Sequence, residues 1–169
     1  MKYILDKLNH CTFKSYEVGR LAPRAYCVPH SKLKSAKAAD YKTERYNSDM
    51  VTILSGEWDF KYYKKKSKLP ATIDTSRIKF DKVNIPCTWQ RTGYEIPEYI
   101  NTPYGFDNRK FGGEWGKGVR PPELPEDFSC GIYRKFINIE DTSKKYVLTF
   151  LGITPCIDLQ RHCSPECPF

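Results

Sequence analysis

The chain has 169 residues, 40% of them hydrophobic and 14% aromatic, and a formal net charge of +8. This length suits one domain with its own core, or one domain with an arm, and no stretch approaches the roughly 20 apolar residues that a bilayer span needs. The seven cysteines are odd in number and irregularly spaced, which argues against a secreted disulfide scaffold. Because the apolar run at residues 3–5 is also too short for a signal peptide, we expect a cytoplasmic protein with reduced thiols.

The first 50 residues are polar and irregular in pattern. They contain two separate prolines, Pro23 and Pro29, and an alanine-rich stretch at 35–40 that tolerates a helical turn. We expect residues 1–50 to form an extended arm that packs on the rest of the domain.

The clearest strand pattern covers residues 56–63. Trp58, Phe60 and Tyr62 alternate with charged residues, so the three aromatic rings share one face of the predicted strand. Residues 64–68 then form a basic, exposed turn that ends at Pro70.

A second strand is predicted at 77–85. Ile78, Phe80 and Val83 are its inward residues, and the change of phase between Phe80 and Val83 indicates a bulge. Pro86 ends this strand because proline has no N–H for a ladder. Residues 88–106 are expected to be loop with short strand pieces. Residues 108–127 form a long loop rich in Gly and Pro, of a length that is usually functional.

Two further strands are predicted at 131–139 and 146–153. The first alternates in polarity, whereas the second is a nearly continuous apolar run of the kind found in strands buried on both faces. A polar turn at 140–143 separates them. With no long amphipathic pattern of helical period, the sum predicts an all-β fold, a β-sandwich with Greek-key or jelly-roll connections.

Six segments, in order and with matching spacing, resemble the N-terminal domain of glycoside hydrolase family 2 β-galactosidases. The segments are 20–26 (RLAPRAY), 54–60 (LSGEWDF), 84–90 (NIPCTWQ), 99–104 (YINTPY), 121–122 with 131–134 (PP…GIYR), and 150–153 (FLGI). After residue 159 the chain departs from the family pattern and reads QRHCSPECPF. The resemblance therefore implies an N-terminal arm at 1–50, a sugar-binding sandwich at 51–159 and an aberrant tail at 160–169, which looks like a truncated or frameshifted reading frame.

What the resemblance implies for fold is a jelly-roll sandwich of the galactose-binding-domain type that packs against a separate (β/α) barrel. In the family that barrel supplies two glutamates, and retaining enzymes hold such a pair about 5–5.5 Å apart. The barrel has no counterpart in these 169 residues. We therefore expect no catalytic residue in this chain, no cofactor on it, and no hydrolysis by it alone; the Mg²⁺ and Na⁺ ions that the family often uses would belong to the whole enzyme.

The resemblance also implies a galactoside contact. By motif match Asn101 is the residue that reaches the galactose subsite, and its amide can both donate to and accept from a sugar hydroxyl. Tyr99 and Tyr104 flank it as weaker candidates. Trp89 and Tyr94 could likewise stack on sugar, but core and interface aromatics are the more common case.

Other functions stay open as alternatives. The chain could be a free-standing carbohydrate-binding module, or a basic sandwich that binds nucleic acid through residues 61–68 (KYYKKKSK). It could also dock onto a separately encoded catalytic chain. We favour a carbohydrate partner and expect neither nucleic acid nor membrane as a partner.

Three further chemistries are weighed and set aside. A metal site would need Cys156, His162, Cys163 and Cys167, whose spacing fits no common closed zinc site. The scattered cysteines Cys11, Cys27, Cys87 and Cys130 are expected to be small core or surface residues. The loop carboxylates could supply an acid–base pair, but their spacing does not favour one; they are Glu95, Glu98, Glu114 and Glu123.

Overall fold

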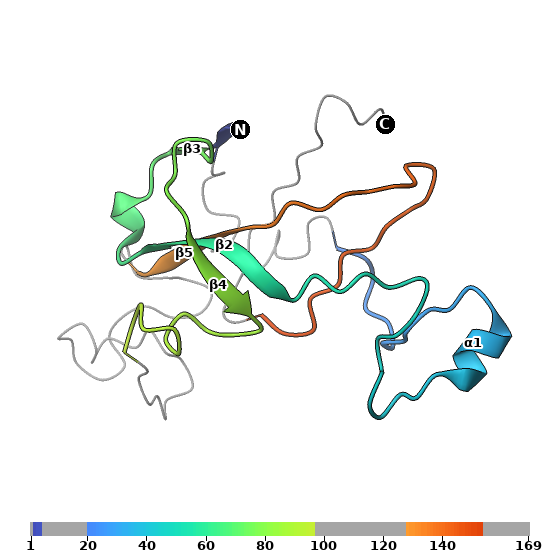
Figure 1. Ribbon diagram of the computed structural model, residues 1–169. Coiled ribbons are helices and arrows are strands. Elements are labelled where there is room, and N and C mark those ends of the chain that lie inside the picture. Colours follow the sequence, from blue (N-terminus) through green and yellow to red (C-terminus); the bar gives the residue numbers. More distant parts are fainter. Residues whose placement is uncertain (1, 5–19, 97–127, 154–169) are drawn as a thin grey trace.

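The computed structural model describes residues 2–4, 20–96 and 128–153 (Figure 1). The predicted contacts Tyr99, Asn101 and Tyr104 and the tail at 160–169 lie outside these ranges. The described elements are, in chain order, β1 (Lys2–Ile4), α1 (Leu33–Ala38), β2 (Gly56–Tyr63), the 3₁₀ turn η2 (Lys66–Lys68), β3 (Thr72–Asp74), β4 (Asp81–Ile85) and β5 (Cys130–Arg134). Neither described helix is long enough or apolar enough to cross a membrane.

The centre of the structure is a three-stranded antiparallel sheet of order β4-β2-β5. The predicted bounds of the first strand are confirmed, since β2 covers residues 56–63. Trp58 lies opposite Val83 of β4, and Phe60 lies opposite Tyr133 of β5. Phe60 is fully buried and Val83 is buried, so the alternating aromatic face of β2 is the face that packs the core.

A second, smaller sheet joins β1 and β3 in antiparallel register. The sequence pattern did not predict β3, which has only three residues, with Ile73 buried at its centre. Ser76 donates to Asp74 through its backbone N–H (3.1 Å) and its hydroxyl (2.6 Å), and the Arg77 N–H donates to the Asp74 carbonyl. The turn occupies the first residue of the strand predicted at 77–85, and β4 itself begins at Asp81, so that prediction is confirmed in part.

Residues 29–49 form a small folded segment around α1. Ser31 donates to the Asp49 carboxylate through its backbone N–H (3.2 Å) and its hydroxyl, and the Ser48 hydroxyl donates to the Pro29 carbonyl. The helical turn predicted at 35–40 is confirmed in part, since the helix runs two residues earlier, over Leu33–Ala38. The division of the chain at residues 50 and 159 stays a prediction.

The strand predicted at 131–139 is confirmed only in its first part, since β5 ends at Arg134. The strand predicted at 146–153 is wrong, because these residues form no strand. The apolar side chains expected to be buried at 136–153 are instead exposed, from Ile139 at 39% to Phe136 at 69%. A strand buried on both faces needs neighbouring strands and a covering layer, and the described residues supply neither for 146–153. The coarse assignment is nonetheless compatible with the structure, which is mostly strand with little helix.

Candidate functional site

Five aromatic rings gather on the core face of the sheet. Around Phe60 lie Trp89, stacked at a centroid distance of 6.3 Å, Tyr94, edge-on at 4.9 Å, and Tyr133, tilted at 4.5 Å. Tyr62 continues the group, 6.0 Å from Trp89 and 5.7 Å from Tyr94. Trp89 and Tyr94 are half-buried and pack against the buried Phe60 ring, which favours the packing role of the two considered for them.

The turn at 88–96 brings Trp89 and Tyr94 onto this face. The Trp89 carbonyl accepts from the backbone N–H groups of Thr92 (3.2 Å) and Tyr94 (3.1 Å). Gly93 lies between those donors at φ +88°, a left-handed conformation that glycine adopts without the steric cost of a Cβ. The turn thus folds back on its own first residues and returns the chain to the sheet.

Glu95 is the polar centre of the aromatic group. Its Oε2 atom accepts hydrogen bonds from Trp89 Nε1 (2.8 Å), Gln90 Nε2 (3.1 Å) and Ser129 Oγ (3.3 Å). Burial, and after it the nearby Glu95 charge, raises the pKa of the Tyr62 phenol. Three donors satisfy the hydrogen-bonding capacity of one oxygen of this half-buried carboxylate and fix its position. We therefore assign Glu95 a structural role and not that of an acid–base catalyst. The other carboxylates weighed for that role (Glu98, Glu114 and Glu123) lie outside the described residues.

This hydrogen-bonded centre also joins two distant parts of the chain. Glu95 closely precedes residues 97–127, and Ser129 closely follows them. Beside this pair, the Lys66 backbone N–H donates to the Phe128 carbonyl (2.8 Å). The chain is therefore fixed to the same end of the sheet just before and just after the stretch that contains the predicted sugar contacts.

Gly131 of β5 is needed for the close approach of Phe60. A Cβ at this position would lie 2.5 Å from Phe60 Cε2 and 3.2 Å from Trp89 Cε3. Because Phe60 is fully buried, its ring has little room to move away. The glycine of the GIYR motif is thus explained by packing in the core.

The opposite face of the sheet carries a charged group. Asp59 of β2 accepts from Arg134 of β5 and Lys82 of β4, its two register partners. The pKa of the Asp59 carboxyl is lowered, first by the hydrogen bond from Lys82 and then by that from Arg134. The Arg134 guanidinium also lies 4.1 Å from the Phe80 ring centroid and 5.0 Å from that of Phe136. The Arg134 guanidinium is therefore held by the Asp59 carboxylate and by the two aromatic rings of Phe80 and Phe136.

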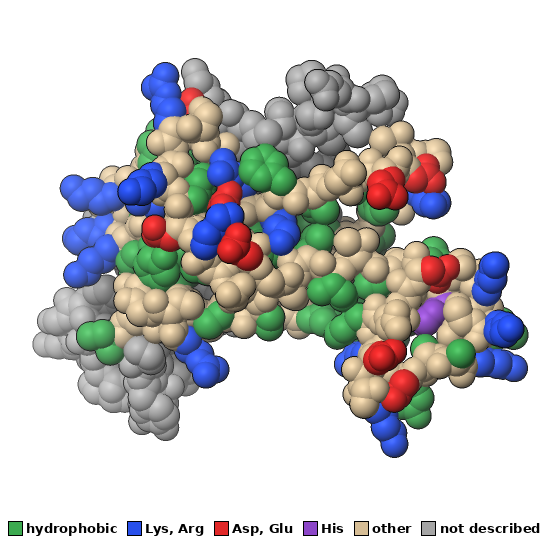
Figure 2. All heavy atoms as spheres, in the orientation of Figure 1, with side chains coloured by type: hydrophobic (Ala, Val, Ile, Leu, Met, Phe, Trp, Pro, Cys, Tyr) green, Lys and Arg blue, Asp and Glu red, His purple; other side chains and the backbone are tan. Residues whose placement is uncertain are grey.

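The basic segment 61–68 differs from what a nucleic-acid site would need. Tyr62 is half-buried and packs against Trp89 and Tyr94, so its ring already has aromatic neighbours within the protein. The Lys66 ammonium lies 5.4 Å from the Phe128 ring centroid. Exposed lysines lie at the end of the sheet near η2. Lys and Arg side chains gather in this region, on the left side of Figure 2. This arrangement is that of a solvated turn.

The metal site considered at Cys156, His162, Cys163 and Cys167 lies outside the described residues. No group of three or more His, Cys, Asp or Glu side chains within them could hold a metal ion. Within the described residues, Cys27, Cys87 and Cys130 form no disulfide. Cys11 also lies outside the described residues.

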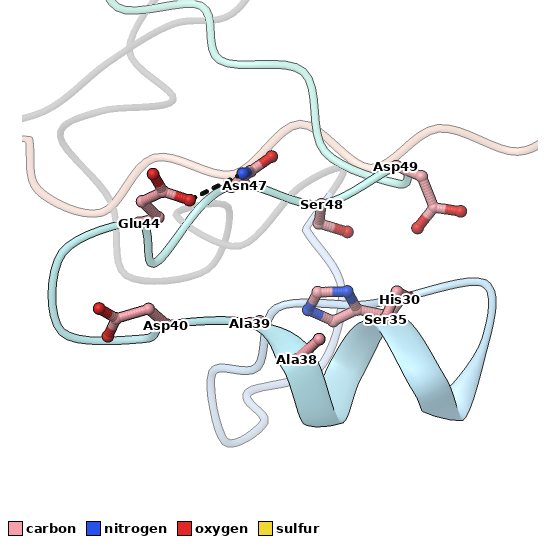
Figure 3. A pocket seen from close by; sticks show the side chains of 9 residues that line it. All are labelled: His30, Ser35, Ala38, Ala39, Asp40, Glu44, Asn47, Ser48 and Asp49. Carbon is pink, nitrogen blue, oxygen red and sulfur yellow. Dashed lines mark hydrogen bonds between the residues drawn. The ribbon is translucent and has the colours of Figure 1, made fainter.

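A shallow hollow beside α1 was not predicted from the sequence (Figure 3). It lies in residues 30–49, and no residue of the six motif segments lines it. The Asn47 amide donates to Glu44 Oε2 (2.9 Å) at its rim, and His30 Nδ1 is buried with no hydrogen-bond partner in the described part of the chain. The lining residues are His30, Ser35, Ala38, Ala39, Asp40, Glu44, Asn47, Ser48 and Asp49.

The structure brings three of the six motif segments together. Segment 54–60 enters β2, segment 84–90 ends β4 and begins the aromatic turn, and segment 131–134 lies in β5. They meet at Phe60, through its contacts with Trp89 and Tyr133. These three motifs are thus parts of one packed unit.

Three curated proteins that resemble the chain are described as β-galactosidases. A β-galactosidase of Staphylococcus xylosus is 32% identical over 154 residues, which cover 89% of this chain and 14% of that protein. A β-galactosidase of Actinobacillus pleuropneumoniae is 29% identical over 141 residues, 83% of this chain and 12% of that protein. One of Alteromonas mediterranea is 26% identical over 163 residues, 91% of this chain and 14% of that protein.

No protein-family model and no solved structure matches the chain. The chain spans 12–14% of the length of these three curated relatives. It is related to the β-galactosidases and corresponds to a small part of such a protein.

Proposed function

We propose that this chain forms a non-catalytic β-sandwich part of a β-galactosidase-type glycoside hydrolase, contributes one side of the galactose site, and hydrolyses nothing by itself. The observation that carries the proposal is the asymmetry of the match: 83–91% of this chain aligns, but only 12–14% of each of the three relatives. We further propose family 2 membership and a jelly-roll connection for the sandwich, of which the β4-β2-β5 sheet would be one part.

The described carboxylates support a non-catalytic role. Retaining glycosidases need two carboxyl groups about 5–5.5 Å apart, one free to attack and one free to transfer a proton. Glu95 accepts from three donors, and Asp59 is bound by Arg134 and Lys82. Both are therefore committed to holding the sheet and its turn together.

The sugar contact is proposed at Asn101, with Tyr99 and Tyr104 beside it. The supporting observation is the rigid frame on either side, in which Glu95 and Ser129 are joined by a hydrogen bond of 3.3 Å. A binding residue on a long loop gains precision when both ends of that loop are held by a scaffold. The Mg²⁺ and Na⁺ ions expected for the whole enzyme have no set of His, Cys, Asp or Glu ligands in the described ranges, and we derive no step through them.

The test is a chimeric enzyme. The whole chain replaces the matched region of the Staphylococcus xylosus β-galactosidase, and hydrolysis of a nitrophenyl β-galactoside is measured. We expect activity, and we expect Asn101→Ala to lower kcat/KM about 5- to 150-fold, because losing one hydrogen bond to substrate costs about 1–3 kcal/mol. Asn84→Ala, at an exposed position of β4, is the control and should leave kcat/KM unchanged. An active chimera in which both variants behave alike would refute the sugar contact.

A further inference from the structure

Glu95 holds the chain at a point where apolar burial does not. Its neighbour Ile96 is 81% exposed, so packing of that side chain does not fix the end of the aromatic turn. The Glu95 carboxylate instead accepts from Trp89 Nε1 (2.8 Å) and Gln90 Nε2 (3.1 Å), six and five positions earlier. The direction in which the chain leaves the turn is therefore set by hydrogen bonds to one side chain.

Ser129 is held by the same side chain on the other side of residues 97–127. The register between β2 and β5 ends at Cys130, so Ser129 lies just beyond the paired part of the sheet. Its hydroxyl donates to Glu95 Oε2 (3.3 Å), the oxygen that the two donors of the turn also use. One carboxylate oxygen thus joins two places that are 34 positions apart in the sequence.

Tyr62 of β2 connects this carboxylate to the sheet. Its phenol is hydrogen-bonded to both Glu95 and Ser129, and its ring packs 6.0 Å from that of Trp89 and 5.7 Å from that of Tyr94. We call the hydrogen-bonded group the Glu95 cluster; its members are Tyr62, Trp89, Gln90, Glu95 and Ser129. All five are half-buried, so their hydrogen bonds are partly shielded from water and strengthened by it. The cluster joins the sheet, the turn and the residue before β5.

Resting on the proposed function, we propose that Glu95 is a positioning residue for the galactoside contact: through the Glu95 cluster it fixes the chain directly before Asn101. Asn101 follows Glu95 by only six positions, so a shift at Glu95 reaches it through few rotatable bonds. A misplacement of about 1 Å at a reacting site can lower the rate about 100-fold, and supporting hydrogen bonds are what hold binding groups in place. Glu95 acts through Asn101 and makes no contact with the sugar.

The contacts of Glu95 differ from those that hold the sheet together. Asp59 links all three strands on the opposite face, whereas the three donors to Glu95 Oε2 lie in the turn and just before β5. Loss of the Asp59 carboxylate therefore weakens the sheet, while loss of the Glu95 carboxylate releases Ser129 from the turn. The two carboxylates allow a structural effect to be separated from a positioning effect.

The test is a double-mutant cycle in the Staphylococcus xylosus chimera, with kcat/KM for a nitrophenyl β-galactoside as the readout. We expect Glu95→Ala to lower kcat/KM about tenfold when Asn101 is present and by less than about twofold when Asn101 is already alanine, because residues that act as one unit give non-additive losses. Ser129→Ala should show the same pattern with a smaller loss. Glu95→Gln, which keeps an acceptor oxygen for the Trp89 indole, should restore part of the activity.

Asp59→Asn is the control, because it weakens the fold from the opposite face of the sheet; its effect on kcat/KM should be the same with and without Asn101. Equal losses for Glu95→Ala in both backgrounds, or an unchanged kcat/KM, would overturn the inference while the effect of Asn101→Ala still supports the proposed function. If Asn101→Ala alone changes nothing, the sugar contact itself is refuted, and the inference with it. Should the Glu95→Ala chimera fail to fold, the cycle between Ser129→Ala and Asn101→Ala decides by the same criterion.

Discussion

Asp59 and Arg134 lie directly opposite each other in β2 and β5, and both Nε and Nη2 of the guanidinium donate to the same carboxylate oxygen, at 2.8 and 2.7 Å. The other oxygen accepts from Lys82 of β4 at 2.9 Å. One half-buried carboxylate thus links all three strands of the sheet. Arg134 adds a bond to the Thr75 carbonyl (3.0 Å), which ties the sheet to the end of β3.

Asp59→Asn should destabilise the protein by about 1–3 kcal/mol, because Arg134 and Lys82 would both lose their charged acceptor. Urea unfolding followed by tryptophan fluorescence measures the change. Glu57→Gln is the matched control, since Glu57 also pairs with Lys82 but is 61% exposed, and its effect should stay within about 0.5 kcal/mol. Equal losses in the two variants would show that Asp59 does not link the strands.

The same carboxylate predicts a pH dependence. The pKa of Asp59 in the folded protein is below its usual value, chiefly through Lys82 and Arg134, so its stabilising contribution is present above about pH 4 and is lost as the pH falls through the folded pKa. The urea midpoint should therefore fall on acidification below about pH 4, and fall less steeply in Asp59→Asn. Part of the slope should persist, because the turn carboxylate of Asp141 has a pKa of about 2. An unchanged slope in Asp59→Asn would contradict the assignment.

Gly131→Ala should cost about 1–3 kcal/mol through overpacking, because the new methyl group would meet the buried Phe60 ring. Gly152→Ala is the control, since a Cβ there meets nothing within 4 Å. The comparison of the two urea midpoints is the measurement. A Gly131→Ala protein as stable as Gly152→Ala would mean that the sheet is more loosely packed than the structure shows.

Glu95→Ala should destabilise the aromatic turn by about 1–3 kcal/mol, because the indole N–H of Trp89 would lose its acceptor. Removing the charge with Glu95→Gln should also lower the pKa of the Tyr62 phenol, which that charge helps to raise. Spectrophotometric titration of phenolate, with Tyr62→Phe to identify the signal, measures this shift. Ser129→Ala, which leaves the carboxylate in place, should have the smaller effect on stability.

The sequence pattern predicted the centre of this fold well. Period-two alternation identified β2 with its bounds and placed Phe60 on the buried face. Pro86 was correctly read as the end of β4, because proline cannot continue a ladder. These features depend on residues close together in the chain, and local pattern is sufficient for them.

Features that depend on distant partners were not predictable in the same way. Residues 146–153 have the composition of a buried strand, but composition does not supply the strands that would pair with them. In the sequence Glu95 is one of several loop carboxylates with nothing to distinguish it, whereas in the structure its three donors include Ser129, 34 positions away. The one local signal was the nearness of Trp89 and Gln90, two side-chain donors within six positions of the carboxylate.

The central claim, that this chain supports a galactose site without performing catalysis, is tested most directly by assaying the purified 169-residue chain for galactose release. The host should lack any β-galactosidase of its own, and the substrate is a nitrophenyl β-galactoside. We predict a rate equal to that of buffer at every chain concentration. Turnover that grows with chain concentration and disappears on changing Glu95 or Glu98 to Gln would contradict the account.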